Sequence, residues 1–147
     1  MKILNQKDPT WANQAIGQTN LKLKDYGCLI VSLSMLSSWY GIYQSPAYLS
    51  RNLKFTDKGL LIWKSIDSVM PMKFVYRYYK KDDCKIKTIL MSKDEACVLQ
   101  VNSSHWVVLI GYSEILGYKI ADPIDGKKKY IPNNYKITGF SELTRKN

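Results

Sequence analysis

Three residues able to act together in nucleophilic catalysis are spread along this 147-residue chain. Cys28 stands in YGCLIVSLSM, where a long apolar helix is expected to begin, and His105, the only histidine, opens HWVVLIGY. Asp122 follows His105 by seventeen residues, at the end of YKIAD. A thiol attacks as the thiolate, which a histidine can generate by taking the proton, and a carboxylate can orient that histidine. In this order, the three residues are the parts of a thiol hydrolase.

The expected setting of Cys28 favours activation of its thiol. A helix N-terminus offers partial positive charge and free backbone amides, and Gly27 permits the sharp entry that would expose the sulfur. By contrast, Cys97 lies in the apolar run ACVLQV and is predicted to be a small buried side chain, while Cys84 stands among charges in KKDDCK. Three cysteines without a CxxC pair, and one histidine, predict neither a disulfide framework nor a metal site.

His105 and Asp122 are expected to lie side by side on neighbouring strands. Both are equidistant from Ser113-Glu114, so a hairpin turning there would bring them together with their side chains on one face. If the turn centres on Gly117 instead, the register shifts and a bulge is needed to restore the pairing. Each residue alone has an ordinary structural explanation, but all three at a helix start and two strand ends favour catalysis.

The first half of the chain is predicted to be mainly helical, after a loop-rich lead-in of twenty-five residues. Apolar residues on nearly all sides indicate a buried central helix from Cys28, which Gly41 is placed to end in a left-handed conformation. Ser45 is a predicted N-cap for a short helix that starts at Pro46 and ends near Leu53. Helical spacing over residues 60–70, closed by a proline, predicts another helix.

The second half is predicted to form an antiparallel sheet, interrupted by a short amphipathic helix after Asp82-Asp83. Strands are expected at KFVYRYY, ACVLQV, HWVVLIGY and GYKIAD, and HWVVLIGY is apolar on both faces, so it should lie inside the sheet. Residues 127–129 are interpreted as a turn leading into a strand. We therefore expect an α+β fold in one domain over residues 1–147, with a helical N-terminal part packed on a C-terminal antiparallel sheet.

Composition narrows the class of protein further. No segment reaches the roughly 18 consecutive apolar residues of a membrane helix, and MKILNQKDPTW lacks a signal-peptide core, so we expect a soluble chain without membrane insertion. The formal charge of +10 suits anionic surroundings such as cell-wall polymers, although the lysines are scattered as on a solvated surface. No nucleic-acid motif accompanies them, and no nucleic-acid partner or cofactor is predicted. Oligomeric state and cellular location are left open.

Four segments resemble the papain-like cysteine peptidases of the bacteriocin-processing family, peptidase family C39, particularly free-standing relatives of the peptidase part of double-glycine leader-cleaving transporters. They are NQKDPTWA at 5–12, YGCLIVSLSMLSSWYG at 26–41, HWVVLIGY at 105–112, and Asp122-Pro123. The resemblance implies a papain-like fold with Cys28 as nucleophile, His105 as general base and later acid, and Asp122 as the orienting carboxylate. The chain departs from the family after the cysteine, where members often carry glycine and proline instead of leucine and isoleucine.

The resemblance also implies an upstream glutamine that stabilises the oxyanion together with the backbone amide of the cysteine. Gln6, in NQKDPTWA, is the first candidate, although it is farther from Cys28 than in the transporter peptidases, so an intervening loop would have to return the chain. Gln18 is nearer in sequence but lies outside the resembling segments, and remains the alternative.

Three functions follow as hypotheses. The first is a cysteine peptidase acting through an acyl-enzyme on a peptide or protein substrate, with double-glycine leaders as one substrate class implied by the resemblance. The second uses the same triad on peptide or amide bonds of the cell wall, as CHAP-type hydrolases do in phage or bacterial lytic components. The third is a non-catalytic papain-like binding domain, with Trp11 and some of the eleven tyrosines as its contact surface.

Overall fold

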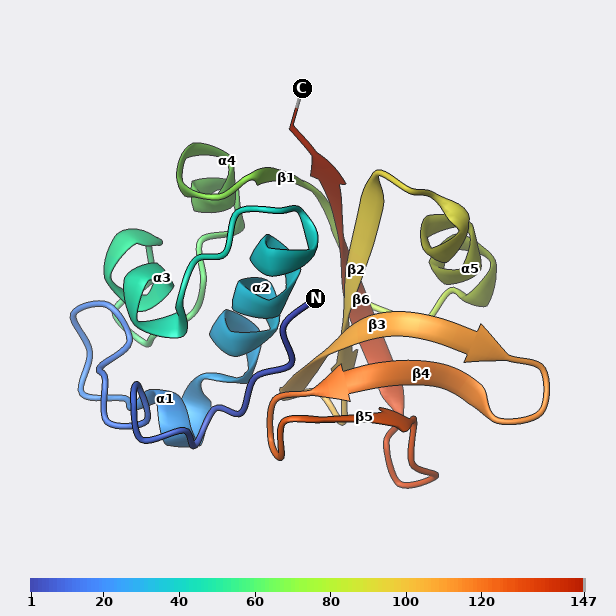
Figure 1. Cartoon of the computed structure of the whole chain (residues 1–147), viewed down its shortest axis with the longest axis horizontal. Coiled ribbons are helices and arrows are strands. Elements are labelled where there is room, and N and C mark those ends of the chain that lie inside the picture. Colours follow the sequence, from blue (N-terminus) through green and yellow to red (C-terminus); the bar gives the residue numbers. More distant parts are fainter. Residues whose placement is uncertain (147) are drawn as a thin grey trace.

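The computed structural model describes residues 1–146 and has helices packed on a six-stranded antiparallel sheet (Figure 1). This confirms the predicted α+β class. The strands follow the order β1-β6-β2-β3-β4-β5 across the sheet. The helices are α1 (Leu23–Tyr26), α2 (Cys28–Trp39), α3 (Pro46–Asn52), η1 (Trp63–Ser65), α4 (Ile66–Val69) and α5 (Asp83–Met91). The strands are β1 (Met72–Tyr78), β2 (Glu95–Val101), β3 (His105–Ser113), β4 (Gly117–Asp122), β5 (Lys127–Tyr130) and β6 (Ile137–Arg145).

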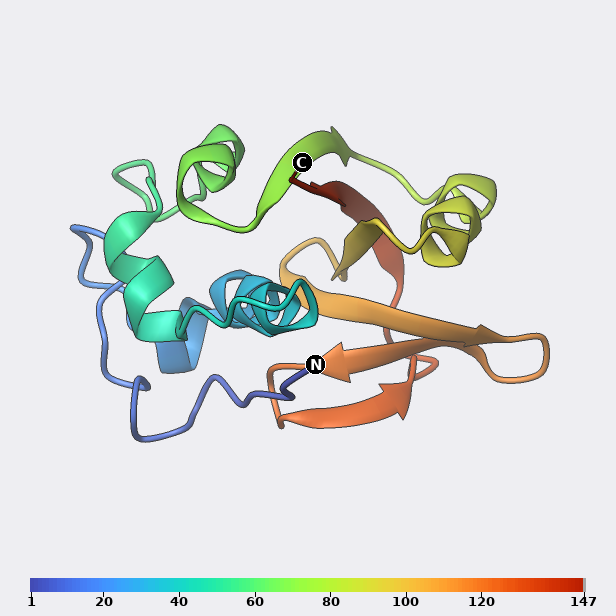
Figure 2. The ribbon, with the colours of Figure 1, turned by 45° about the horizontal axis from the view of Figure 1, so that its top comes forward.

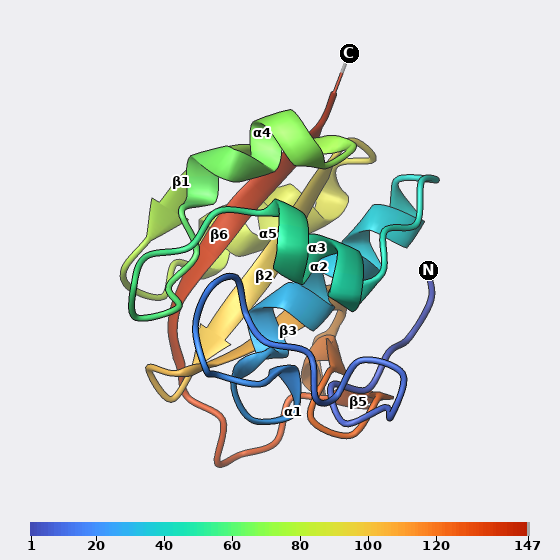
Figure 3. The same cartoon turned by 90° about the vertical axis from the view of Figure 1, so that its left-hand side faces the viewer.

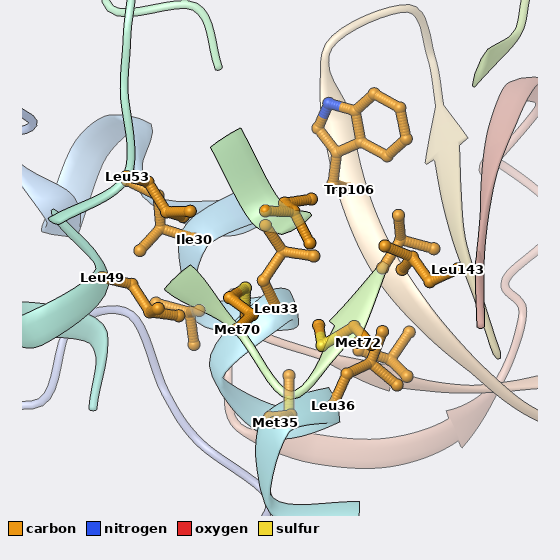
Figure 4. Close-up of a cluster of buried hydrophobic side chains, with 14 of the residues drawn as sticks. Ile30, Leu33, Met35, Leu36, Leu49, Leu53, Met70, Met72, Trp106 and Leu143 are labelled. Atoms are coloured by element: carbon orange, nitrogen blue, oxygen red, sulfur yellow. The ribbon is translucent and has the colours of Figure 1, made fainter. Parts of the chain in front are cut away.

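Helix α2 is the centre of the helical part, as its sequence predicted. Every residue from position 30 to 37 is buried, and Figure 4 shows side chains of this helix packed against residues of α3, β1, β3 and β6. Gly41 follows the helix with a φ of +94°, and its N–H donates to the carbonyl of Ser38. The helix therefore ends in the left-handed glycine expected from the sequence. Trp39, in its last turn, is 40% exposed.

The central strands of the sheet, β2, β3, β4 and β6, are buried on both faces, while the edge strands β1 and β5 keep exposed residues. Figures 1 and 3 show α2 and α3 on one side of the sheet, and α5 lies on the opposite side. Side chains alternate between two cores, as strand periodicity requires. Val98, Val108, Ala121 and Leu143 face the α2 side. Leu99, Val107, Ile120 and Phe140 face the α5 side. Because β3 lies between β2 and β4 and contributes to both cores, its sequence is apolar from Trp106 to Ile110.

The sheet is strongly twisted. In Figures 1 and 2, strands β3, β4 and β5 run across the direction of β2 and β6, which is the outcome of right-handed strand twist accumulated over the sheet. The twist carries the start of β3 and the end of β4 toward the N-terminal end of α2. This arrangement determines which residues can meet at that end of the molecule.

Three sequence expectations need correction. Residues 127–129, interpreted as a turn leading into a strand, already belong to β5. The helix predicted over residues 60–70 begins only at Trp63, because a turn at Gly59, with a φ of +81°, and a bridge between Phe55 and Leu61 hold the preceding residues extended. Strand β6 was not predicted, although it lies between β1 and β2. Its sequence contains Gly139 and two buried polar residues, Ser141 and Glu142, which interrupt the apolar pattern.

Other residues lie where the sequence indicated. The side chain of Cys97 is buried and that of Cys84 is exposed. Ser45 accepts a hydrogen bond from the N–H of Tyr48, and thus caps α3. Within residues 1–146, no helix combines the length and apolar character needed to cross a membrane.

Candidate active site

Cys28 is the first residue of α2, and Gly27 joins this helix to α1. A Cβ on Gly27 would approach the carbonyl oxygen of Leu23 to 2.5 Å, which is too close for any side chain. Glycine is therefore required for the abrupt change of direction between the two helices. This turn leaves Cys28 half-buried at the N-terminal end of a twelve-residue helix, where backbone N–H groups lack helical acceptors and the helix dipole is positive.

Contacts one turn along the helix hold Cys28 close to β3. The buried hydroxyl of Ser32, four residues after Cys28, donates to the carbonyl of Trp106 at 3.4 Å. The thiol of Cys28 itself lies 3.9 Å from the carbonyl oxygen of Ser104, to which it can donate. Both acceptors are immediate neighbours of His105 in the chain. The helix is thus attached to β3 on either side of the histidine.

The β3-β4 hairpin brings His105 and Asp122 together by way of a bulge. Its closing pair is Ser113 with Gly117, so the register from the turn alone would put the two side chains on opposite faces. The register shifts by one residue between positions 109 and 111, and Val108 then pairs with Ala121. After this shift His105 and Asp122 share one face, as diagonal neighbours. The turn thus centres on Ile115, between the two positions considered from the sequence, and a bulge restores the pairing.

The two side chains form a close ion pair. His105 Nε2 lies 2.7 Å from Asp122 Oδ1, with the aspartate fully buried and the histidine side chain 19% exposed. Because Nε2 is directed at the carboxylate, Nδ1 is the ring nitrogen left for the thiol of Cys28. The sequence-predicted cysteine, histidine and aspartate are thus brought together, from α2, β3 and β4.

Burial and charge have opposite effects on these groups. Burial lowers the pKa of His105, but the hydrogen bonds and charges of Asp122 and Cys28 outweigh it and raise that pKa to about 9. Burial likewise raises the pKa of Asp122, but hydrogen bonds from His105, Tyr135 and the Ile124 backbone, with the charge of His105, bring it well below its ordinary value. A protonated imidazole beside an ionised carboxylate is therefore the stable form at neutral pH.

Two further residues contact Asp122 that the sequence did not reveal. The hydroxyl of Tyr135 donates to Oδ2 at 2.7 Å, and the Lys129 ammonium lies 3.2 Å from the same oxygen. Lys129 reaches Asp122 through the β4-β5 pairing, in which Asp122 pairs with Lys127, two residues before Lys129 on the same short strand. Tyr135 follows two asparagines in a loop, where no periodicity indicates its direction.

Gln6 lies between the segment that precedes Cys28 and the turn that follows Asp122. Its buried side chain donates from Nε2 to the carbonyl of Lys24 at 3.0 Å, and its backbone N–H donates to that of Pro123 at 2.8 Å. The amide group has two N–H donors, so this bond leaves one for another acceptor. Gln18 is exposed in a turn. The intervening loop does return the chain toward Cys28, as a role for Gln6 requires.

Trp11 does not belong to an exposed contact surface. Its ring is 8% exposed in the core beside α2, and its indole N–H donates to the carbonyl of Asn5 at 2.9 Å. The expectation that Trp11 offers a binding surface is therefore wrong, because the N-terminal loop folds back over the helices.

Comparison with known protein families gives a match that covers most of the chain. Residues 18–139 match the peptidase C39 family. The matched stretch includes Cys28, His105 and Asp122, while Gln6 precedes it. No curated protein matches the sequence.

Proposed function

This chain belongs to the peptidase C39 family, a family of cysteine peptidases, and we propose that Cys28, His105 and Asp122 are the residues with which it hydrolyses peptide bonds. The observation that carries the proposal is the 2.7 Å contact between His105 and Asp122, at a strand end next to the thiol of Cys28. An oriented base beside a thiol at a helix N-terminus is the arrangement that nucleophilic catalysis needs.

In the first half of the reaction, His105 holds the proton that it has taken from the thiol, and the sulfur of Cys28 attacks as the thiolate and forms a bond to the peptide carbonyl carbon. The carbonyl oxygen becomes an oxyanion, which the backbone N–H of Cys28 and the side-chain amide of Gln6 stabilise. When the oxyanion collapses, the C–N bond breaks, and His105 gives its proton to the leaving amine. An acyl-enzyme thioester remains on Cys28.

In the second half, water attacks the thioester carbon while His105 accepts one of its protons. The C–S bond then breaks, the carboxylic acid product leaves, and the thiol recovers its proton. Asp122 keeps Nε2 of the imidazole occupied throughout, so that Nδ1 carries both proton transfers. The departure from the family after the cysteine, at Leu29 and Ile30, changes the first turn of α2 and removes no reacting atom.

Two classes of substrate remain distinct proposals. Peptides or proteins, with double-glycine leader peptides as one class, are favoured by membership of the family. Peptide or amide bonds of a bacterial cell wall are favoured by the charge of +10, which attracts an anionic polymer.

The test compares wild type, Cys28→Ala and the matched variant Cys84→Ala on a peptide library and on purified cell walls. We expect wild type and Cys84→Ala to cleave peptides equally and Cys28→Ala to lose activity by about 10⁴-fold or more. Solubilised walls without peptide cleavage would replace the peptidase proposal with the wall-hydrolase alternative. Hydrolysis of neither substrate by wild type would leave the non-catalytic binding domain.

A further inference from the structure

Tyr135 contacts both members of the His105–Asp122 pair. Its hydroxyl donates to Asp122 Oδ2 at 2.7 Å, and its ring meets the imidazole edge-to-face, with centroids 5.7 Å apart. Tyr135 therefore gives the Asp122 carboxylate and the His105 imidazole each a contact in addition to the one between them.

The segment that carries Tyr135 also holds the turn that leads into His105. Asn102, at the start of this turn, exchanges backbone and side-chain hydrogen bonds with Lys136, and its side chain donates to the carbonyl of Asn134. The N–H of Ser103 donates to the hydroxyl of Thr138 at 3.0 Å. Asn102 and Ser103 have φ angles of 52° and 64°, a left-handed conformation that side chains disfavour. These hydrogen bonds keep the strained turn in place.

Within residues 1–146, the Asp122 carboxylate has three hydrogen-bond donors and one ion-pair partner. Oδ1 receives His105 Nε2 and, at 3.0 Å, the backbone N–H of Ile124, while Oδ2 receives Tyr135 and the Lys129 ammonium. Lys129 is itself shared with Asp125, at 2.7 Å. The donors on Oδ2 fix the rotation of the carboxylate, so that Oδ1 stays directed at the histidine. They also take part of the negative charge that His105 would otherwise meet alone.

We propose that Tyr135 is a positioning residue, which orients the Asp122 carboxylate toward His105 and shares its charge. The proposal rests on the proposed function of the pair. It assigns to the β5-β6 connection a part in setting the protonation of the imidazole.

The charged and titratable groups around the pair define the expected result. Cys28 faces His105 from α2, and Lys129 faces Asp122 from β5. When Tyr135→Phe removes the hydroxyl, the buried carboxylate keeps its charge and has one donor fewer. Protonated His105 and Lys129 are then the positive charges that remain beside the carboxylate, with the N–H of Ile124, so the pKa of His105 rises. Looser orientation of the carboxylate lowers kcat by roughly tenfold with KM unchanged. Loss of a residue that hydrogen-bonds to a metal-binding side chain has an effect of similar size in metalloenzymes.

The pKa of His105 is measured by NMR, in which the sole histidine gives unambiguous ring signals. Tyr135→Phe is compared with wild type and with the control Tyr130→Phe, whose ring lies near Lys119. Lys129→Met, which removes a cation from the same carboxylate oxygen, serves as a second variant. We expect both Tyr135→Phe and Lys129→Met to raise the pKa of His105, and Tyr130→Phe to leave it unchanged.

An unchanged or lowered pKa of His105 in folded Tyr135→Phe would overturn the inference, whatever the enzyme cleaves. Thermal unfolding of each variant establishes that it is folded. The titration is independent of turnover, so it separates this inference from the function. Full peptidase activity in Cys28→Ala would reject the proposed function even if the pKa of His105 responded to Tyr135→Phe as expected.

Discussion

His105 is unlike a surface histidine, because it has an ionised carboxylate on one side and a thiol on the other. Burial lowers the pKa of His105, but Asp122 and Cys28 have the larger combined effect and raise it to about 9. The imidazolium needed to protonate the leaving amine is therefore present throughout the neutral range.

The alkaline limb of the activity profile follows from this pKa. We expect kcat/KM for a peptide substrate to hold through neutral pH and to fall as His105 loses its proton near pH 9. The measurement is a pH profile with a substrate that does not ionise in this range. A limb near pH 6.5, the ordinary value for histidine, would show that Asp122 and Cys28 do not stabilise the imidazolium.

The two glutamine candidates can be separated by matched substitutions. Gln6 lies between the segment before Cys28 and the turn after Asp122. We expect Gln6→Ala to lower kcat by about 10²-fold or more, as when one oxyanion donor is lost. Gln18→Ala alters an exposed turn and should leave kcat unchanged. The comparison is made well below the unfolding temperature of either variant. Retained kcat in Gln6→Ala would remove this residue from the oxyanion site.

At the scale of elements, the join between α1 and α2 sets the position of the thiol. Gly27→Ala forces a Cβ against the backbone of Leu23, so we expect a loss of about 1–3 kcal/mol in unfolding free energy and a marked fall in kcat. The matched control is Gly41→Ala at the other end of α2. Gly41 has a positive φ and open space around it, so alanine there costs stability and leaves kcat intact.

Urea unfolding and steady-state kinetics of both glycine variants make this comparison. Equal effects on kcat would mean that the first turn of α2 does not position Cys28. A Gly27→Ala variant as stable as wild type would show that α1 can move away from α2 without cost.

The elements that carry the site were predictable because each has a local signal. Continuous apolar character identified α2 and β3, and Gly41 and Ser45 marked helix boundaries. The β3-β4 register was less certain, because it depends on where the turn closes and on a bulge near position 110, for which Gly111 is a weak local signal. Tyr135 and Lys129 became visible only in the folded chain, since their approach to Asp122 depends on the paths of β5 and the loop after it.

At the scale of the whole molecule, the ion pair links folding to pH. The pKa of His105 is raised from 6.5 in the unfolded chain to about 9, so its stabilising contribution is fully present below about pH 6.5 and is lost as pH rises through 9. The pKa of Asp122 is lowered, so its contribution is present above about pH 4 and is lost as pH falls below that. Stability should therefore be greatest between these limits.

Urea unfolding between pH 6.5 and 9.5 tests the alkaline side of this expectation. We expect the free energy of unfolding of wild type to fall by at most about 3 kcal/mol over this range, and that of His105→Ala to change much less. The variant starts from a lower value, because it leaves the Asp122 carboxylate buried without its partner. An equal slope in both proteins would assign the pH dependence to other groups.

The central claim is that His105 activates the thiol of Cys28, and the rate of alkylation by iodoacetamide at neutral pH measures this directly. Mass spectrometry separates the three cysteines: Cys84 is exposed and Cys97 is buried, so they set the rates for an ordinary accessible thiol and a protected one. The account predicts that half-buried Cys28 reacts faster than Cys84, and that His105→Ala removes the difference. Labelling of Cys28 no faster than Cys84 in the wild-type protein would contradict it.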